Sequence, residues 1–139
     1  MGNFAGHALR VEYIDGIEWK VIEQTILDNF RFVTNHGEVL IPDDGFITDF
    51  ASVPAFLSNI IPRTGKGKFG AYGPSCVIHD YLYVTGKIDG KWVTRKYADD
   101  IFVECNNALG VSGWVTRLMY HEIRLWGSFV WYSHKDGRP

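Results

Sequence analysis

Turn signals divide the chain into a strand-rich first third and a helix-rich remainder. Up to about residue 45, short segments of alternating apolar and polar residues are separated by glycine-containing turns. From about residue 75, longer segments with helical spacing follow. Strands followed by helices are typical of an α+β fold. The sequence therefore predicts an N-terminal antiparallel β-meander or set of hairpins, followed by three to four helices of which the central two pack antiparallel.

Two turns define the predicted strands. Segments 7–13 and 17–22 alternate on either side of Asp15-Gly16, and segments 30–33 and 38–41 flank Asn35-His36-Gly37. Glycine adopts the left-handed conformation that tight hairpin turns require. Residues 42–45 are expected to close the sheet, and residues 86–90 are expected to form a further small hairpin.

Capping residues set the predicted helix boundaries. A short helix is expected from Ser52 to about residue 61, followed by a glycine-rich loop over residues 63–74. Pro74 and Ser75 would open the next helix. A third helix is expected to begin after Thr94 and run to about Leu109, with Gly110 as its end. The last would run from Ser112 to about Tyr132 unless Gly127 interrupts it.

Length and composition limit the possible functions. At 139 residues the chain fits a single domain, and 46 % hydrophobic and 15 % aromatic residues predict an ordered core. A formal charge of −2 gives no basic excess, so nucleic-acid binding is not expected. No apolar run is long enough to span a membrane, and no signal peptide is recognised. Two cysteines are too few for a disulfide scaffold or a zinc cage.

One predicted helix carries a polar stripe on an otherwise apolar surface. His79, Asp80 and Tyr83 lie on this stripe, which must find polar partners or line a cavity. On the next helix, Asp99 and Asp100 lie on opposite flanks of the apolar face, so periodicity does not select the one that faces His79. A histidine oriented by an aspartate can act as a general base. The alternatives without a catalytic role are that His79 is a hydrogen-bonded core residue and that Asp99 forms a surface ion pair with Arg95, one turn away.

Glu122 is a further candidate because it lies in the middle of an apolar arc of the last helix. A carboxylate in that position must be neutralised, paired or directed into a cavity. We expect Glu122 either to point toward His79 or to pair with an arginine such as Arg10, Arg31 or Arg63.

The pattern His79-Asp80-x-x-Tyr83 followed by Ala98-Asp99-x-x-Phe102 resembles the paired helices of secreted and viral phospholipases of the A-two type. This resemblance implies that His79 activates water, that Asp80 binds calcium and that Asp99 orients the histidine. Tyr83 would belong to the supporting hydrogen-bond network. The implied cofactor is a divalent cation, calcium rather than zinc. Cys76 and Cys105 are also similar to that family's helix cross-link, although the sequence leaves open whether they are bonded.

A second resemblance covers more of the chain. It rests on three motifs that resemble an uncharacterised family frequent in tailed-phage genomes, domain of unknown function 1353. These motifs are Gly45-x-x-Thr48-Asp49-x-Ala51-Ser52-Val53-Pro54, His79-Asp80-x-Leu82-Tyr83 and Arg95-x-x-Ala98-Asp99-x-x-Phe102. It draws attention to Asp49, which would be a further ligand or acid in the cleft or would satisfy amides at a helix start.

Together these observations predict a small phage or prophage protein that hydrolyses an ester or an envelope bond, with a His79–Asp99 dyad activating water. Its expected location is the host cytoplasm or the virion. The alternative is a virion, tail or host-interaction protein, whose partners would be other phage proteins or host envelope components. In that case the His–Asp–Tyr cluster is a structural network. A third interpretation is binding of a small anionic ligand at the glycine-rich loop.

Overall fold

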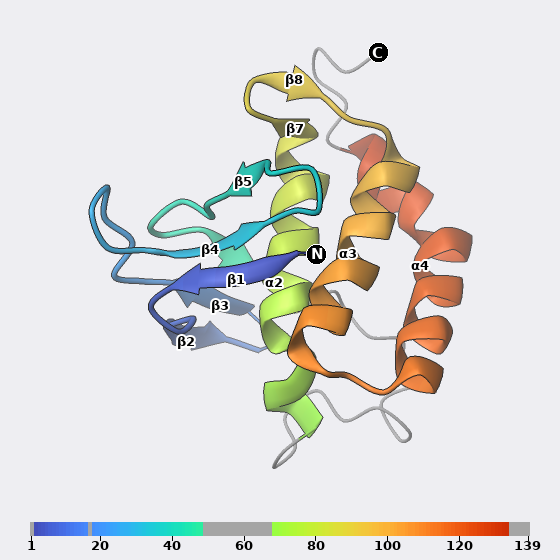
Figure 1. Ribbon diagram of the computed structural model, residues 1–139, viewed down its shortest axis with the longest axis horizontal. Helices are drawn as coiled ribbons and strands as arrows, with labels where there is room; N and C mark the ends of the chain where they lie inside the picture. The colour runs from blue at the N-terminus through green and yellow to red at the C-terminus, as the bar shows by residue number, and fades with distance from the viewer. Residues whose placement is uncertain (1, 17, 49–67, 134–139) are drawn as a thin grey trace.

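The N-terminal strands lie on one side of a group of three helices (Figure 1). The structure is a computed structural model that describes residues 2–16, 18–48 and 68–133. The strands in these ranges are β1 (Asn3–Gly6), β2 (Val11–Asp15), β3 (Glu18–Val21), β4 (Phe30–Val33), β5 (Val39–Leu40), β6 (Ile47–Thr48), β7 (Lys87–Ile88) and β8 (Lys91–Trp92). The helices are α2 (Lys68–Thr85), α3 (Arg95–Leu109) and α4 (Gly113–Ser133). The predicted α+β class is confirmed.

Both predicted N-terminal hairpins are present, but their strands belong to two sheets. β2 pairs antiparallel with β3, and β4 pairs antiparallel with β5. Each turn contains a glycine in the left-handed conformation, Gly16 (φ 54°) in the first and Gly37 (φ 81°) in the second. β1 and β6, which the pattern did not predict, add to these pairs, so that the strand orders are β1-β4-β5 and β2-β3-β6. The loop after β3 carries the chain from one sheet to the other, and for this reason a single meander does not form.

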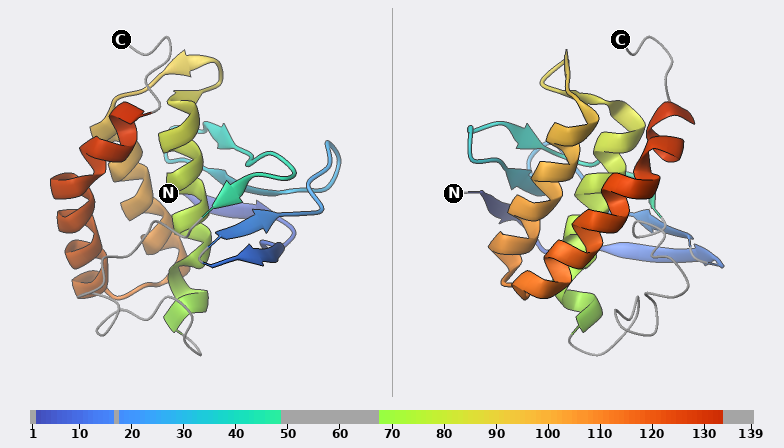
Figure 2. Two further views of the ribbon diagram at one scale, coloured as in Figure 1. Left: turned by 180° about the vertical axis from the view of Figure 1, so that it is seen from behind. Right: turned by 90° about the vertical axis from the view of Figure 1, so that its right-hand side faces the viewer.

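The three helices run alternately up and down. In Figure 1, α2 rises to the small β7–β8 hairpin, α3 descends beside it, and α4 rises along the outer side of α3. The same arrangement is seen from two further sides in Figure 2. The expected antiparallel packing of the two central helices is thus confirmed, and the β7–β8 hairpin predicted over residues 86–90 connects them.

The sequence predicted both ends of α3 correctly, but it misplaced the start of α2. The Thr94 side chain accepts a hydrogen bond from the backbone amide of Tyr97, and Gly110 ends α3 in the left-handed conformation at φ 74°. The prediction of a loop up to residue 74 was wrong, because α2 already begins at Lys68. Tyr72 is buried in the core, and this packing outweighs the helix cost of nearby glycines, about 1 kcal/mol each. The short helix expected from Ser52 lies outside the described residues.

The main core lies between the sheets and the helices. Alternating side chains of β4, Phe30 and Phe32, are buried there, and Phe4 of β1 contacts both rings. The helices contribute residues such as Ile78, Leu82 and Ile101. None of the described helices is both long and apolar enough to cross a bilayer, as the sequence predicted.

Candidate functional site

Asp99 is the centre of a buried polar network between α2, α3 and α4. Its Oδ1 atom lies 2.8 Å from Nε2 of His79 and accepts a 2.6 Å hydrogen bond from the Tyr83 hydroxyl. Its Oδ2 atom accepts a 2.6 Å hydrogen bond from Arg124 and lies 3.6 Å from Nη1 of Arg95. We call these five residues the Asp99 network. Asp99 is completely buried, and His79 is 4 % exposed.

Helical spacing explains why α2 delivers two side chains to the same carboxylate. His79 and Tyr83 are one turn apart and therefore project from the same side of α2. Their rings lie 4.3 Å apart between centroids, and the Phe102 ring of α3 packs against His79 in a T-shaped arrangement. The imidazole is consequently held by ring packing as well as by its bond to Asp99.

The network favours the ionised form of Asp99. Burial acts to raise the pKa of this carboxyl group, but hydrogen bonds from His79, Tyr83 and Arg124 outweigh it and hold the pKa below its ordinary value. For Tyr83, burial first and then the bond to Asp99 raise the pKa well above that of an ordinary tyrosine. At neutral pH the carboxylate is therefore an acceptor and the phenol a donor.

A bond from a carboxylate to Nε2 also assigns the proton of the neutral imidazole. Because the ionised Asp99 can only accept, Nε2 of His79 must carry the hydrogen in this contact. The other ring nitrogen, Nδ1, then has the lone pair that can take up a proton. The geometry thus satisfies the first requirement for a general base that is oriented by an aspartate.

The helix α4 supplies parts of this network that the sequence pattern did not identify. Arg124 reaches Asp99 directly, and Arg95 donates to the backbone carbonyls of Ile123 and Arg124. Gly127 allows α4 to approach Tyr83 of α2 closely, because a Cβ atom at this position would lie 2.5 Å from the Tyr83 hydroxyl. A glycine inside an otherwise good helix was the one signal that could have indicated this contact.

Asp80 lies on another side of α2 and faces the sheets. Its Oδ2 atom accepts a 2.5 Å hydrogen bond from the hydroxyl of Thr48, the last residue of β6. Two of the sequence motifs, separated by about thirty residues, therefore meet at this contact. Asp49, the next residue after Thr48, lies outside the described residues. Within the described parts of the chain, no three His, Cys, Asp or Glu side chains are grouped as a metal site would require.

Asp100 does not face His79. It accepts hydrogen bonds from Lys96 and from the hydroxyl of Tyr120, on the outer side of α3. The ambiguity between the two aspartates is resolved in favour of Asp99. The alternative ion pair of Asp99 with Arg95 is present at 3.6 Å, but it is buried, not on the surface, and Arg95 is only one of the contacts of Asp99.

Glu122 is half-buried, and its Oε2 atom is shielded from solvent and accepts no hydrogen bond from the described residues. Two of the arginines considered as partners bond elsewhere, Arg10 to Glu23 and Arg31 to Asn29. Arg63 lies outside the described residues. Most of the apolar arc around Glu122 proves to be exposed, so this carboxylate is not in the core as the arc suggested.

The two cysteines are buried thiols on neighbouring helices, Cys76 on α2 and Cys105 on α3. Burial raises the pKa of Cys105 well above its ordinary value. The structure has no disulfide between these two described residues, so the helix cross-link implied by the phospholipase resemblance is not formed.

An α+β fold with a His–Asp–Tyr network between two antiparallel helices is thus the class that the structure defines. Residues 24–123 match the model of a family described as "Protein of unknown function (DUF1353)". The chain therefore belongs to this family, as its motifs indicated. No curated protein and no solved structure matched the chain.

Proposed function

We propose that this protein is a hydrolase in which His79 acts as a general base and Asp99 orients its ring. The observation that supports this most directly is the 2.8 Å contact between His79 Nε2 and Asp99 Oδ1. The bond from Tyr83 to the same oxygen fixes the carboxylate in turn. An ester substrate, in a lipid or in a bacterial envelope, fits the phospholipase-like arrangement, and the family resemblance supports a phage or prophage origin.

In the proposed reaction, Nδ1 of His79 removes a proton from a water molecule as its oxygen attacks the ester carbonyl. The tetrahedral intermediate then collapses, the bond to the leaving alkoxide breaks, and the imidazolium returns its proton to that alkoxide. General-base catalysis of this kind contributes roughly 10²–10⁴-fold to the rate. Arg124 and Arg95 offset much of the negative charge of Asp99, so its main contribution would be to orient the ring.

Asp80 is the residue that we propose for a divalent cation. Its carboxylate and the Thr48 hydroxyl are hard oxygen donors, and this type of ligand suits calcium better than zinc. When bound, calcium would supply a positive charge that can polarise the carbonyl group of a substrate. Because the described residues contain no complete cluster of ligands, further donors would have to come from Asp49 or from backbone carbonyls.

The burial of the network favours a second candidate function, that of a non-enzymatic virion, tail or host-interaction protein. Asp99 is fully buried and contacts four side chains, and His79 is 4 % exposed. Such a network can serve to fix the packing of helices. In this case His79 would be unreachable and no ester would be turned over.

Turnover and access can be measured separately. Fatty-acid release from phosphatidylglycerol micelles and hydrolysis of p-nitrophenyl butyrate, each with calcium and with a chelator, should fall by roughly 10²–10⁴-fold in His79→Ala. Asp100→Asn is the matched control, because it changes the neighbouring carboxylate that faces away from His79. Full turnover by a folded His79→Ala variant would contradict the proposal.

Access to His79 can be tested without a substrate. Diethyl pyrocarbonate should modify His79 if its Nδ1 atom can be reached, and the exposed His36 and His121 serve as internal controls in the same peptide map. Protection of His79 alone would favour the structural alternative. Nitrogen NMR of the imidazole should show the form protonated at Nε2, and the opposite tautomer would refute the assignment.

A further inference from the structure

The two carboxylate oxygens of Asp99 have separate sets of partners. Oδ1 is turned toward α2, where Nε2 of His79 lies 2.8 Å away and the Tyr83 hydroxyl donates at 2.6 Å. Oδ2 accepts one hydrogen bond from the described residues, at 2.6 Å from Nη1 of Arg124 on α4. The carboxylate turns as one planar unit about a soft torsion, so a bond at one oxygen fixes the direction of the other. The bond to Arg124 therefore sets the angle at which Oδ1 meets His79.

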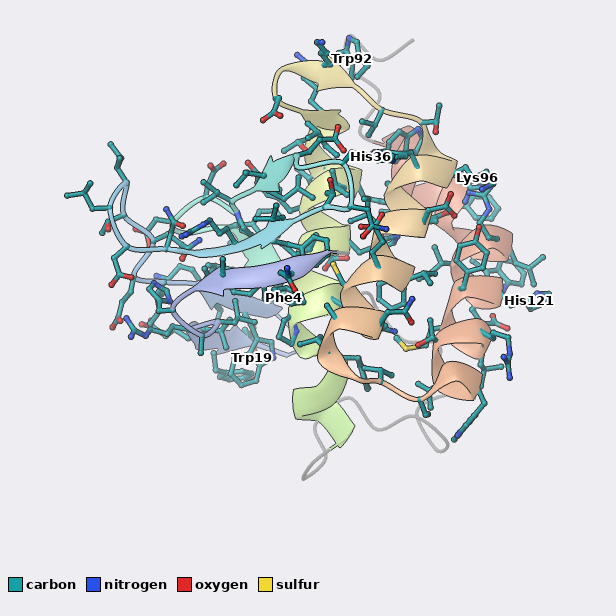
Figure 3. All side chains as sticks on the ribbon, in the orientation of Figure 1. Phe4, Trp19, His36, Trp92, Lys96 and His121 are labelled. Atoms are coloured by element: carbon teal, nitrogen blue, oxygen red, sulfur yellow. The ribbon has the colours of Figure 1, made fainter. Side chains whose placement is uncertain are left out.

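The two neighbouring cations cannot take the place of Arg124 without giving up their own partners. Nη1 of Arg95 is 3.6 Å from Oδ2, too far for a hydrogen bond, and this side chain donates to the backbone carbonyls of Ile123 and Arg124 instead. Lys96, which lies beside α4 in Figure 3, bonds to Asp100 at 2.8 Å. Arg124 is consequently the cation that determines the position of Oδ2.

Arg95 and Arg124 connect α3 and α4 in opposite directions. Arg95 reaches from the first turn of α3 to the backbone of α4, at 3.3 and 3.4 Å. Arg124 reaches back from α4 to Asp99, one turn further along α3. The backbone of Arg124 and its guanidinium group are thus both held by α3. A donor that is fixed by its own hydrogen bonds can hold an acceptor in a defined orientation.

Solvent reaches Arg124 more than it reaches the groups that Arg124 holds. The Arg124 side chain is 32 % exposed, compared with 16 % for Arg95, 5 % for His79 and 0 % for Asp99. Replacing Arg124 by a small residue would therefore remove the part of the Asp99 network that already borders on water. The space left beside Oδ2 should then admit a small cation from solution.

We propose that Arg124 is a positioning residue, which turns the Asp99 carboxylate so that its Oδ1 atom meets His79. Without Arg124, Oδ2 would be a buried charged acceptor with no donor, which is strongly unfavourable. The carboxylate would turn toward Arg95, and Oδ1 would move away from His79 and Tyr83. The expected effect on turnover rests on the proposed hydrolase function, but the orientation of the carboxylate can be measured without a substrate.

Arg124→Ala in the full chain tests this role by nitrogen NMR of the His79 imidazole at mildly alkaline pH. The fraction of His79 in the neutral form protonated at Nε2 should fall, because that proton loses its acceptor. With an ester substrate, kcat should fall roughly 10–10²-fold and KM should stay unchanged, since the reacting group is misplaced and the substrate is not. Arg117→Ala is the matched control, because Arg117 is exposed on the same face of α4 and is not bonded to Asp99.

Free guanidinium ion can replace the missing group in Arg124→Ala. Guanidinium chloride, at concentrations far below those that unfold proteins, should restore the Nε2-protonated form of His79 and most of the lost turnover. It should also raise the thermal unfolding midpoint of Arg124→Ala, because it binds the folded state. Urea has a similar planar shape without the charge, and sodium chloride has the same ionic strength, so neither should restore the variant.

Unchanged imidazole protonation in Arg124→Ala would overturn the proposal, even if the variant were less stable. A loss that guanidinium does not reverse would also overturn it, because the damage would then be to the fold. If Arg124→Ala does not fold, Arg124→Lys keeps the charge but lacks the planar donor group, and full Nε2 protonation in that variant would overturn the proposal. A wild-type protein without turnover, but with guanidinium rescue of the imidazole in Arg124→Ala, would contradict the proposed hydrolase and still support the positioning of Asp99 by Arg124.

Discussion

Gly127→Ala tests whether the close contact between α4 and Tyr83 holds the Asp99 network in place. The added Cβ atom would lie 2.5 Å from the Tyr83 hydroxyl and 3.2 Å from Nη1 of Arg95. The arginine can move, but the tyrosine ring packs against His79 and, in a T-shaped arrangement, against Trp131. Either α4 must shift outward or the bond from Tyr83 to Asp99 must lengthen. Strain of this kind typically costs about 1–3 kcal/mol.

Gly113→Ala is the matched control in the same helix. A Cβ atom there would meet only the end of the flexible Arg117 side chain, at 3.8 Å. Alanine stabilises a helix by about 1 kcal/mol relative to glycine, and each variant gains part of this stabilisation. The free energy of unfolding of Gly127→Ala should therefore fall below that of Gly113→Ala by about 1–3 kcal/mol. Urea denaturation followed by circular dichroism measures the difference. Equal stability of the two variants would refute the packing argument.

The charge of Asp99 gives two further predictions. Asp99→Asn should reduce the free energy of unfolding by about 3 kcal/mol, because it leaves the cations of a buried network uncompensated. The loss is not larger because Arg124 is 32 % exposed and can be hydrated. Asp100→Asn should cost less than about 1 kcal/mol, because its bond to Lys96 is exposed, and an equal loss in both variants by urea denaturation would contradict this account. The folded-state pKa of Asp99 is depressed, so its stabilisation is complete above its ordinary value of 3.8 and is lost as the pH falls through the lower folded-state value. Acid titration of unfolding should show this loss in the wild type and a flatter profile in Asp99→Asn; parallel profiles would refute it.

Local signals in the sequence were sufficient for the class of fold and for many element boundaries. Asp15-Gly16 predicted a hairpin, and Thr94 and Gly110 predicted both ends of α3. These features depend on interactions between residues a few positions apart, such as a cap or a left-handed turn. The same local signals misplaced the start of α2, because the burial of Tyr72 involves residues that are distant in the sequence.

The candidate site was predicted only in part. The spacing of His79 and Tyr83 placed both side chains on one stripe of a helix, but periodicity left Asp99 and Asp100 equivalent as partners. Packing of α3 against α2 and α4 decided between them, because it buried one aspartate and left the other beside Lys96. The sequence did not assign Arg124, and Gly127 was only a glycine inside a helix, since the contribution of both residues depends on how α4 is rotated against its neighbours.

The sequence by itself determined which helix carries the imidazole and the phenol, because one helical turn fixes the direction of both side chains. Only the tertiary structure decided which carboxylate completes the network, that Asp80 faces β6 instead, and that much of the apolar arc of α4 is exposed. The physical reason is that helical periodicity fixes angles within one helix, whereas the rotation of one helix against another depends on packing across the whole core.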